Sequence, residues 1–394
     1  MLALSCGAIW AILVFYLLSR VLRQFRAHNS SALEPAPPPA RSPTVSIIVP
    51  VRNEIANIAH CLQGLTAQRG IADASSIIIV DDESEDGTRA AVEEEIARGA
   101  PLMLASAGEL PEGWIGKPHA CWRGALLAKG DWLCFIDADV RAAPELVAAA
   151  VAAAEAWGTD MLSLHPFQEL GSFWERLVIP AGLLIIACAK DLPDPKKARG
   201  SEAETNGQFL LIRRETYFDV GGHASVRAEI CEDKALAARV KRARYRFRVM
   251  TAERLARTRM YRDFNSLWEG FSKNAVEILG GPRATMSAAL GGSAAGWAAI
   301  LLPLTICYGA FRNPSAAREA GAALALLGSA VMAGTHLGTA RHFRIPAVFA
   351  LLFPLGYTAA ACIAGCSVLL RRKGRVSWKG RTYRLQRNAP SGSA

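Results

Sequence analysis

Charge is scarce in this sequence. Asp, Glu, Lys and Arg make up 20% of its 394 residues, below the roughly 25% of typical soluble domains. Hydrophobic residues make up 51%, which excludes a disordered chain, a collagen-like chain and a small disulfide scaffold. The runs with the least charge lie at the two ends. Residues 44–285 between them have a mixed composition and are numerous enough for one large α/β core.

Cysteine pairs and phosphate-binding glycine loops are also missing. The nine cysteines form no C-x-x-C pair and no Cys/His cluster with zinc spacing, which favours reduced thiols in a cytoplasmic domain. The pair Gly116-Lys117 is no Walker loop, because Pro111 and Pro118 stand where that motif needs Gly and Ser or Thr. No G-x-G-x-x-G follows a strand-like run. These absences disfavour P-loop hydrolases and Rossmann dehydrogenases.

The first apolar run has no basic residue in front of it. It covers residues 2–18 without a charge, and about 17–25 such residues span a bilayer. A cleaved signal peptide would carry Lys or Arg before the run, whereas here the basic residues follow it: Arg20, Arg23 and Arg26. We therefore expect an uncleaved anchor at 1–20, with the chain cytoplasmic from there onward. The basic, Pro-rich linker at 21–43 would act as a spacer.

Three further apolar runs close the chain, at about 286–310, 317–335 and 345–370. Each is long enough to cross a bilayer, and the basic tail at 371–394 indicates a cytoplasmic end. A cytoplasmic middle domain and a cytoplasmic tail require an even number of crossings between them, so three candidates conflict. The run 286–310 is rich in Gly and Ala and could be re-entrant. The count of two or three membrane helices stays open.

The net charge of +10 does not indicate a nucleic-acid-binding protein. Eight of the 45 Lys and Arg residues lie in the tail beside an apolar run, and anionic lipid head groups explain that placement better than nucleic acid does. We expect a multi-pass protein of the cell (inner) membrane, with the lipid bilayer as partner and no nucleic acid.

Apolar strand-like runs alternate with helical runs in the middle of the chain. Such alternation predicts an α/β domain with a mainly parallel sheet covered on both faces, in which ligands bind at the carboxyl ends of the strands. The predicted strands are 45–50, 76–80, 101–104 and 132–136. The predicted helices are 53–65, 90–98 and 119–129. Acidic residues directly follow two of these strands, which makes the strand ends the candidate site.

A pair of carboxylates follows the fourth predicted strand. Asp137 and Asp139 are separated by one residue and can approach a hard divalent cation from one side. Mg²⁺ typically keeps several waters and binds one or two carboxylates together with substrate phosphates. This pattern indicates a metal–diphosphate site, and an ordinary acidic loop is the alternative.

Two other acidic pairs have a functional and a structural interpretation. Asp82 follows a strand and could accept a hydrogen bond from a nucleotide base or ribose, or its segment could only cap a helix through Ser84 or Asp86. Glu232 and Asp233 open a helical run. A carboxylate there could be a general base for an alcohol, or it could only interact favourably with the helix dipole.

The order of these segments resembles the family 2 glycosyltransferases with the nucleotide-diphospho-sugar (GT-A) fold. The chain supplies VSIIVPVRNE, IIIVDDESEDGT, FIDADV, GQFLLIRRETYFDVGG and CED, and the resemblance covers about 44–285. Three further segments are similar to membrane-bound members that glycosylate lipids, namely hopanoid-associated, carotenoid-type and ceramide glucosyltransferases. These are GWIGKPHACWRGA (113–125), RMYRDFNSLWEGFSKN (259–274) and the basic motif of Trp378, Gly380, Arg381 and Tyr383.

The resemblance implies a role for each candidate side chain. Asp82 would contact the nucleotide base, and Asp137 and Asp139 would bind the diphosphate through Mg²⁺ or Mn²⁺. Asp233 would be the general base. The remaining substrate-binding candidates are Lys117, Glu232, Arg259 and Arg262. Arg262 is followed by Asp263 and not by the Trp of the Q/R-x-x-R-W motif, which argues against a processive polysaccharide synthase.

A short apolar run inside the predicted catalytic domain bears on the acceptor. Residues 177–189 are too few to span a bilayer. They form either a buried core helix or an interfacial segment along which a lipid reaches the active site.

These roles predict an inverting, metal-dependent hexosyltransferase that moves a sugar from a nucleotide-diphospho-sugar, UDP-linked in our expectation, to a hydroxyl of a membrane lipid. One base without a nucleophilic carboxylate implies a single displacement, by analogy with glycosidases. A nucleotidyltransferase and a non-catalytic membrane scaffold are the alternatives. The first usually has a Gly-rich basic loop, which is missing after 45–50, and the complete acidic set argues against the second.

Overall fold

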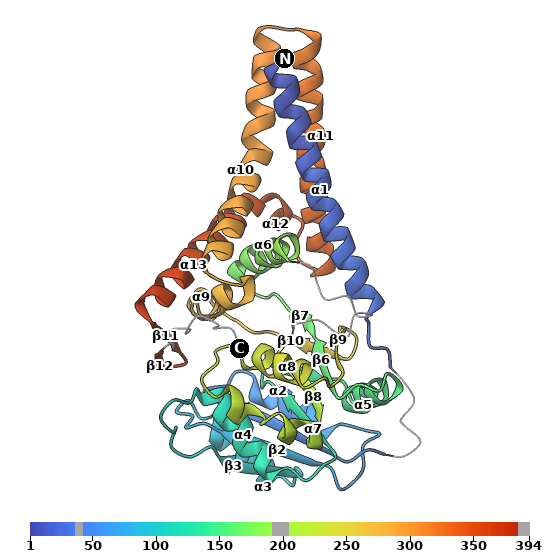
Figure 1. Cartoon of the computed structure of the whole chain (residues 1–394), viewed down its shortest axis with the longest axis vertical. Coiled ribbons are helices and arrows are strands. Elements are labelled where there is room, and N and C mark those ends of the chain that lie inside the picture. Colours follow the sequence, from blue (N-terminus) through green and yellow to red (C-terminus); the bar gives the residue numbers. More distant parts are fainter. Residues whose placement is uncertain (36–41, 191–204, 385–394) are drawn as a thin grey trace. The chain divides into compact units, whose positions relative to one another are not determined.

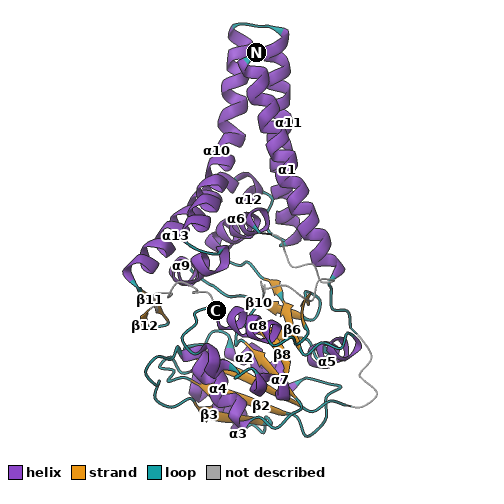
Figure 2. Cartoon of the chain, in the orientation of Figure 1, coloured by secondary structure: helices purple, strands orange, loops and turns teal. Residues whose placement is uncertain are grey.

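The chain folds into two compact units in the computed structural model, which describes residues 1–35, 42–190 and 205–384 (Figure 1; Figure 2). The helical unit comprises Met1–Arg26, Leu170–Leu192 and Tyr261–Trp378. The α/β unit comprises Ala27–Glu169, Pro193–Met260 and Lys379–Ala394. The segments of the two units alternate along the chain, so neither unit is one continuous stretch of sequence.

A seven-stranded sheet forms the centre of the α/β unit, with the strand order β3-β2-β1-β4-β8-β6-β9. The strands are β1 (Val45–Val51), β2 (Ser76–Asp81), β3 (Leu102–Ser106), β4 (Trp132–Ile136), β6 (Met161–His165), β8 (Phe209–Arg213) and β9 (Phe247–Thr251). Neighbouring strands from β3 to β4 are parallel, as are β6 and β9, whereas β8 runs antiparallel to β4 and β6. The predicted α/β class with a mainly parallel sheet is confirmed.

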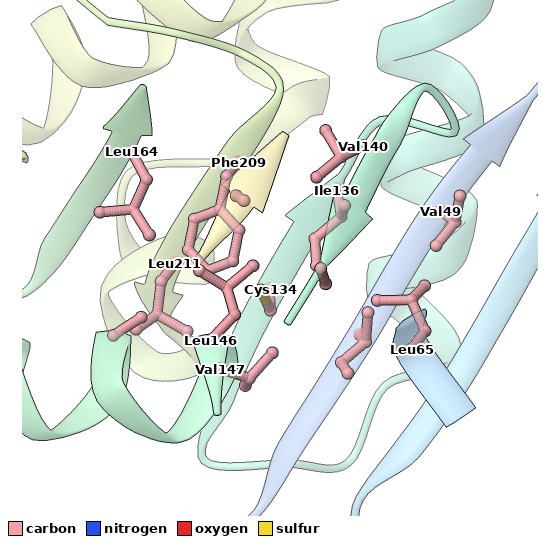
Figure 3. Packing of buried hydrophobic residues seen from close by; sticks show 14 of the residues in the cluster. Val49, Leu65, Cys134, Ile136, Val140, Leu146, Val147, Leu164, Phe209 and Leu211 are labelled. Carbon is pink, nitrogen blue, oxygen red and sulfur yellow. The ribbon is translucent and has the colours of Figure 1, made fainter. Parts of the chain in front are cut away.

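Helices cover both faces of this sheet because its central strands are apolar on both faces. Val49 of β1 packs in one buried cluster with Leu65 and Leu146 (Figure 3), whereas the adjacent Ile48 packs in a second cluster with Leu236. The helices are α2 (Ile58–Thr66), α3 (Thr88–Ala97), α4 (Gly116–Leu127), α5 (Leu146–Ala156), α7 (Arg214–Asp219) and α8 (Glu232–Arg242). The continuous apolar sequence of β1 thus reflects burial on two sides.

The first helix of the unit begins later than its sequence predicts. We expected a helix from residue 53, but α2 begins at Ile58. The backbone N–H of Asn53 donates to Ser84 Oγ at 3.1 Å, and that of Glu54 donates to Thr88 Oγ1 at 2.7 Å. These bonds tie the loop after β1 to the loop after β2, and they keep Glu54 out of the helix.

A smaller sheet lies beside the predicted metal-binding segment. Its strand order is β5-β10-β7, formed by β5 (Val140–Ala142), β10 (Ala256–Thr258) and β7 (Phe167–Gln168). Strand β10 is antiparallel to β5 and pairs Thr258 with Val140. Because Val140 directly follows Asp139, this register brings Thr258 close to the carboxylate pair.

Within the described residues, four helices are long and apolar enough to cross a membrane: α1 (Leu2–Ser30), α10 (Pro282–Arg312), α11 (Ala316–His342) and α13 (Phe353–Lys373). The helical unit also contains α6 (Phe173–Ala189), α9 (Phe264–Leu279) and α12 (Val348–Leu351). Small residues allow close packing: a Cβ on Gly7 of α1 would lie 2.2 Å from the carbonyl oxygen of Gly321 in α11. In Figure 1, α1 and α11 accordingly run side by side.

The run 286–310 is part of a continuous helix of 31 residues, α10, without the break that is typical of a re-entrant segment. Two of its glycines allow close packing against neighbouring side chains. Gly292 lies against Ile185, and Gly296 lies against Tyr357 of α13, where a Cβ would come within 3.0 and 2.9 Å of those side chains.

The compact units do not follow the boundaries that the sequence suggested. Helix α1 continues through Ser30, so the first part of the predicted linker at 21–43 is helical. Helices α6 and α9 fall within the predicted catalytic domain at 44–285, but they belong to the helical unit because they pack against α13 and α10. The functional extent of the catalytic domain stays a prediction.

Candidate active site

Acidic side chains meet at the carboxyl edge of the sheet. Strand β1 is parallel to both of its neighbours, pairing Val51 with Asp81 of β2 and Ile48 with Phe135 of β4. The carboxyl ends of the three strands therefore lie side by side, and each is followed by a carboxylate. These carboxylates are Glu54 after β1, Asp82 after β2, and Asp137 and Asp139 after β4.

Asp82 is held rigidly at this edge. Its backbone N–H donates to the carbonyl of Val51 at 2.9 Å, and its side chain is only 5% exposed. Oδ2 accepts from Arg381 at 2.5 Å, while Oδ1 is buried without a hydrogen-bond partner in the described part of the chain. The loop after β2 is stabilised by Asp86 instead, whose carboxylate accepts hydrogen bonds from the backbone N–H groups of Ile55 and Thr88. Asp82 thus retains an unused acceptor.

Lys117 joins the two groups of acids that the sequence singled out. Its Nζ lies 2.7 Å from Asp137 Oδ1 and 3.0 Å from Glu232 Oε1. Burial opposes the charged form of Lys117, but the two carboxylates dominate and raise its pKa well above the usual value. Lys117 comes from the first turn of α4, where Pro118 is tolerated because its missing N–H needs no helical partner. The predicted phosphate-binding lysine is therefore paired with carboxylates.

Asp139 is the least compensated carboxylate of the centre. Burial, together with the charges of the nearby Asp137 and Glu54, raises the pKa of Asp139 to about 7. Gln208 Nε2 donates to Oδ2 at 3.3 Å, and Thr258 also hydrogen-bonds the side chain. Oδ1 is buried and has no partner among the described residues. An unused oxygen on a buried carboxylate is the environment in which a bound cation would be strongly favoured.

Two carboxylates are enough for a metal that also binds phosphate. Across residues 1–35, 42–190 and 205–384, no cluster of three or more Asp, Glu, His or Cys side chains has the geometry of a metal site. Asp137 and Asp139 nevertheless fit Mg²⁺ or Mn²⁺, because such ions complete their shells with substrate phosphates and water. The residues at this edge therefore suit a cation that arrives together with a diphosphate.

Asp233 lies in the first turn of α8, next to Glu232. Its Oδ2 accepts from Thr205 Oγ1 at 2.8 Å, and the backbone of Gly207 packs so closely that a Cβ there would lie 3.2 Å from the carboxyl carbon. Burial raises the pKa of Asp233, and the charge of Glu232 raises it further. A carboxylate of raised pKa is a better proton acceptor, as a general base requires.

Residues 46–232 match the family model described as Glycosyl transferase family 2. This segment is a family 2 glycosyltransferase domain. The match favours sugar transfer over the nucleotidyltransferase alternative. The match covers the carboxyl ends of β1, β2 and β4 and ends at Glu232. Most of the acidic centre described above therefore lies within the glycosyltransferase domain.

Relatives and a solved structure extend this result. The chain is 27% identical over 250 residues to a 4,4'-diaponeurosporenoate glycosyltransferase of Staphylococcus aureus, covering 62% of this chain and 64% of the relative. It is 26% identical over 236 residues to the protein of that name from Staphylococcus haemolyticus, covering 59% and 60%. The chain thus spans less than two-thirds of the length of these relatives.

A solved mannosyltransferase from Pyrobaculum calidifontis, in complex with GDP-Man and Mn²⁺, matches 94% of this chain and 99% of its own chain. The TM-score is 0.54 at 18% identity. This likeness concerns the fold and supports the GT-A class that the sequence predicted.

The two predicted arginines belong to different units. Arg259 directly follows Thr258, the last residue of β10 in the α/β unit, and Thr258 pairs with Val140 next to the carboxylate pair. Arg262 is exposed and belongs to the helical unit. Their roles toward a substrate stay predictions.

Four residues lie beside the carboxylates at the edge of the sheet but were not predicted as site residues from the sequence. They are Glu54, Gln208, Thr258 and Arg381. Glu54 had a signal, because it follows β1 as Asp82 follows β2, but the sequence placed it in a helix. Gln208 and Thr258 hydrogen-bond each other at 2.7 Å, a contact between distant segments without a local pattern. The basic tail was predicted to contact lipid head groups. The structure instead pairs Arg381 of that tail with Asp82.

Proposed function

We propose that this protein is an inverting glycosyltransferase that moves a hexose from a nucleoside diphosphate sugar to a hydroxyl of a membrane lipid. One observation carries the proposal: Lys117 bridges Asp137, a proposed ligand of the metal–diphosphate group, and Glu232, the neighbour of the proposed base Asp233. The donor residues and the acceptor-activating residue thereby form one centre, as a direct transfer needs.

The proposed chemistry is a single displacement. Asp233 takes the proton of the acceptor hydroxyl, the oxygen attacks the anomeric carbon, and the bond from that carbon to the diphosphate oxygen breaks. The nucleoside diphosphate leaves with the bonding electron pair, and one displacement inverts the anomeric configuration. The hydrogen bond from Thr205 fixes the Asp233 carboxylate for this proton transfer.

Asp137 and Asp139 would hold a divalent cation, Mg²⁺ or Mn²⁺, whose charge would stabilise the leaving diphosphate. Lys117 contributes positive charge next to the same group. Asp82 would bind the nucleotide base through its unused Oδ1. We propose UDP as the nucleotide, since a carboxylate can accept from the N3–H of uracil, as it also could from the N–H groups of guanine.

Aromatic side chains in the helical unit support a membrane lipid as the acceptor. The rings of Trp174 and Phe264 lie 4.5 Å apart, and those of Phe173 and Phe349 lie 5.5 Å apart. Such clusters are typical of the level of lipid head groups. Phe173 and Trp174 are the first two residues of α6, which packs against α13, α9 and α10. In Figure 1, α6 lies across the direction of α10, which suits an interfacial segment better than a spanning one.

The C-terminal strand supports a topology with two crossings after the catalytic segment. Residues from Lys379 onward belong to the α/β unit, so the tail and the catalytic residues lie on one side of the bilayer. An even number of helices must then cross between residues 260 and 379. We assign the crossings to α10 and α11, and place α13 in the interface with α6 and α9, against which it packs. With α1 this gives three crossings and a cytoplasmic catalytic domain.

Asp233→Asn tests the proposal. The change keeps the size of the side chain but removes its basicity, so we expect transfer to a lipid acceptor to fall by about 100-fold or more. Donor binding, measured by calorimetry with UDP-sugars, should change less than threefold. Asp219→Asn, an exposed carboxylate in the same unit, is the matched control. Loss of donor binding together with normal turnover at saturating donor would contradict the base assignment.

A further inference from the structure

The C-terminal strand enters the acidic edge of the glycosyltransferase domain. Strands β11 (Arg375–Trp378) and β12 (Arg381–Arg384) form a two-stranded sheet. The two residues between them, Lys379 and Gly380, both have positive φ, +46° and +79°, as a tight hairpin turn needs. The turn sets the directions in which the side chains of Lys379 and Arg381 point.

Both basic residues at this turn contact the loops after β1 and β2. Arg381 donates through Nη1 to Asp82 Oδ2 at 2.5 Å and through Nη2 to the carboxylate of Glu83. Lys379 donates to the carbonyl of Arg52 at 2.8 Å and to the carboxylate of Glu54. The Arg381 side chain is 15% exposed, so the contact with Asp82 is largely shielded from water and from salt.

The contact leaves a specific set of polar atoms unused. Asp82 Oδ1 and His119 Nδ1 are buried, with 3% and 5% of the two residues exposed, and neither has a hydrogen-bond partner in the described part of the chain. The two side chains are close enough to interact electrostatically. Trp114 packs its ring edge against His119, with centroids 5.4 Å apart. Buried polar atoms without partners are rare in folded proteins and indicate a missing partner.

Gly116 leaves space for the side chains of Asp82, Arg381 and Tyr383. A Cβ at Gly116 would lie 2.4 Å from Asp82 Oδ2 and 2.9 Å from Arg381 Nη1. The Tyr383 hydroxyl lies 3.1 Å from the same point and hydrogen-bonds Arg381. The absence of a side chain at the start of α4 thus permits the approach of β12 to Asp82.

We propose that β12 is part of the donor site, with Arg381 as the residue that positions Asp82 for the nucleobase. Arg381 engages one carboxylate oxygen and leaves the other free for an N–H of the base, while the His119 ring offers a neighbouring polar atom for a base carbonyl. An N–H beside a carbonyl is found on the imide edge of uracil and on the N1–H/C6=O edge of guanine, and the UDP donor proposed above presents the first of these. The assignment of the edge to a nucleotide rests on the function proposed above; the role of the C-terminal strand goes beyond it.

Arg381→Gln in the full chain is the main test, with Arg375→Gln as the control, since Arg375 is an exposed residue of the other hairpin strand. UDP affinity is measured by calorimetry in lipid nanodiscs, and KM and kcat are measured for the donor. We expect Arg381→Gln to weaken UDP binding and raise the donor KM by at least tenfold, with kcat changed less than threefold. Arg375→Gln should match the unmodified protein. Equal UDP affinity in both variants would overturn the proposal.

A double-mutant cycle separates positioning from a general structural role. If Arg381 acts through Asp82, then Arg381→Gln added to Asp82→Asn should change UDP affinity less than twofold. Independent effects that multiply would overturn the positioning role. Tyr383→Phe is a milder second variant that keeps Arg381 and its charge. It should weaken UDP binding by a few-fold, and an unchanged affinity would count against the arrangement.

The same titrations distinguish failure of this inference from failure of the proposed function. Normal sugar transfer by Arg381→Gln at low donor concentration would refute the role of β12 and leave the function intact. UDP binding that depends on Arg381, without transfer to any lipid, would refute the function and support the inference. Failure of the unmodified protein to bind UDP, while it binds a nucleotide without an imide edge, would overturn the base assignment.

Discussion

The Lys117 ammonium group lies within hydrogen-bond distance of both carboxylate oxygens of Asp137, at 2.7 and 2.9 Å. A cation that binds Asp137 would have to share these oxygens with Lys117 or displace it. The lysine is thus a competitor for the carboxylate as well as a source of positive charge for the diphosphate. This dual position explains why its replacement should affect metal binding and turnover in opposite directions.

Lys117→Met should tighten Mn²⁺ binding and slow transfer. Removal of the ammonium group frees both Asp137 oxygens, so the dissociation constant for Mn²⁺, measured by electron paramagnetic resonance, should fall several-fold. Loss of a charge that stabilises the leaving group should reduce kcat by about 10- to 100-fold. Lys129→Met, at an exposed position two residues after the end of α4, should change neither quantity. Weaker Mn²⁺ binding in Lys117→Met would show that the lysine supports the metal site instead of competing with it.

Asp139→Asn should abolish metal-dependent transfer without lowering stability. The amide has nearly the same shape but cannot supply a charged ligand, so activity should fall by about 100-fold or more. The side chain is a buried carboxylate with one unpartnered oxygen, and its neutralisation removes a buried charge. The thermal midpoint in EDTA should therefore stay unchanged or rise. Asp73→Asn, at an exposed position, is the control, and a lower midpoint for Asp139→Asn alone would contradict this account.

Leu183→Asp should impair activity toward acceptors embedded in a bilayer. Leu183 is an exposed apolar residue of α6, 39% accessible, whereas its neighbours Leu184 and Ile185 are buried in the apolar cluster of the helical unit. A charge at Leu183 is costly in the head-group layer but harmless in water. Transfer to a liposomal lipid should drop at least fivefold more than hydrolysis of the donor by water. Met103→Asp, on β3 of the α/β unit, should affect both equally, and an identical pattern for Leu183→Asp would place α6 away from lipid.

His223 should make the α/β unit less stable in mild acid. Burial lowers the pKa of His223 to about 4, and the ring is hydrogen-bonded to the Tyr217 hydroxyl at 2.9 Å. The unfolded chain binds a proton near pH 6.5 while the folded protein does not, so stability is complete above that pH and falls as pH drops toward 4. The loss should reach about 2 kcal/mol at pH 5 from this residue alone.

Denaturant unfolding of the solubilised protein between pH 7.5 and 5 measures this effect. His223→Gln should have a flatter dependence on pH than the unmodified protein, whatever its absolute stability. His60→Gln, at an exposed position, should keep the original slope. Equal slopes in all three proteins would mean that His223 titrates alike in the folded and unfolded states.

The central strands could be predicted because each is a continuous apolar run buried on two faces. The apolar runs around Ile47 and Cys134 predict strands. The parallel pairing of Ile47 with Cys134 brings the acidic residues that follow these strands together. A carboxylate directly after such a run is a strong local signal. This is why Asp82, Asp137 and Asp139 were found at the correct edge of the sheet, while their roles toward a substrate stay predictions.

Contacts between distant segments leave no local pattern in the sequence from which they could be predicted. Arg381 and Asp82 are 299 positions apart, and nothing in the local pattern of a basic tail distinguishes a partner carboxylate from a lipid head group. Glu54 was missed for a different reason. The apolar spacing after β1 resembles a helix, but the backbone N–H groups of this loop donate to the hydroxyl oxygens of Ser84 and Thr88 and hold it out of the helix. Tertiary contacts decided both cases.

The central claim is best tested by analysing the products of the purified protein in nanodiscs of membrane lipid with UDP-hexoses. We predict one UDP released per glycosylated lipid, with the anomeric configuration inverted in the product, as read by mass spectrometry and nuclear magnetic resonance. This turnover should require Mg²⁺ or Mn²⁺ and should be lost in Asp233→Asn. UDP release without a glycolipid, or a glycolipid with retained configuration, would contradict the proposed transfer to a membrane lipid by single displacement.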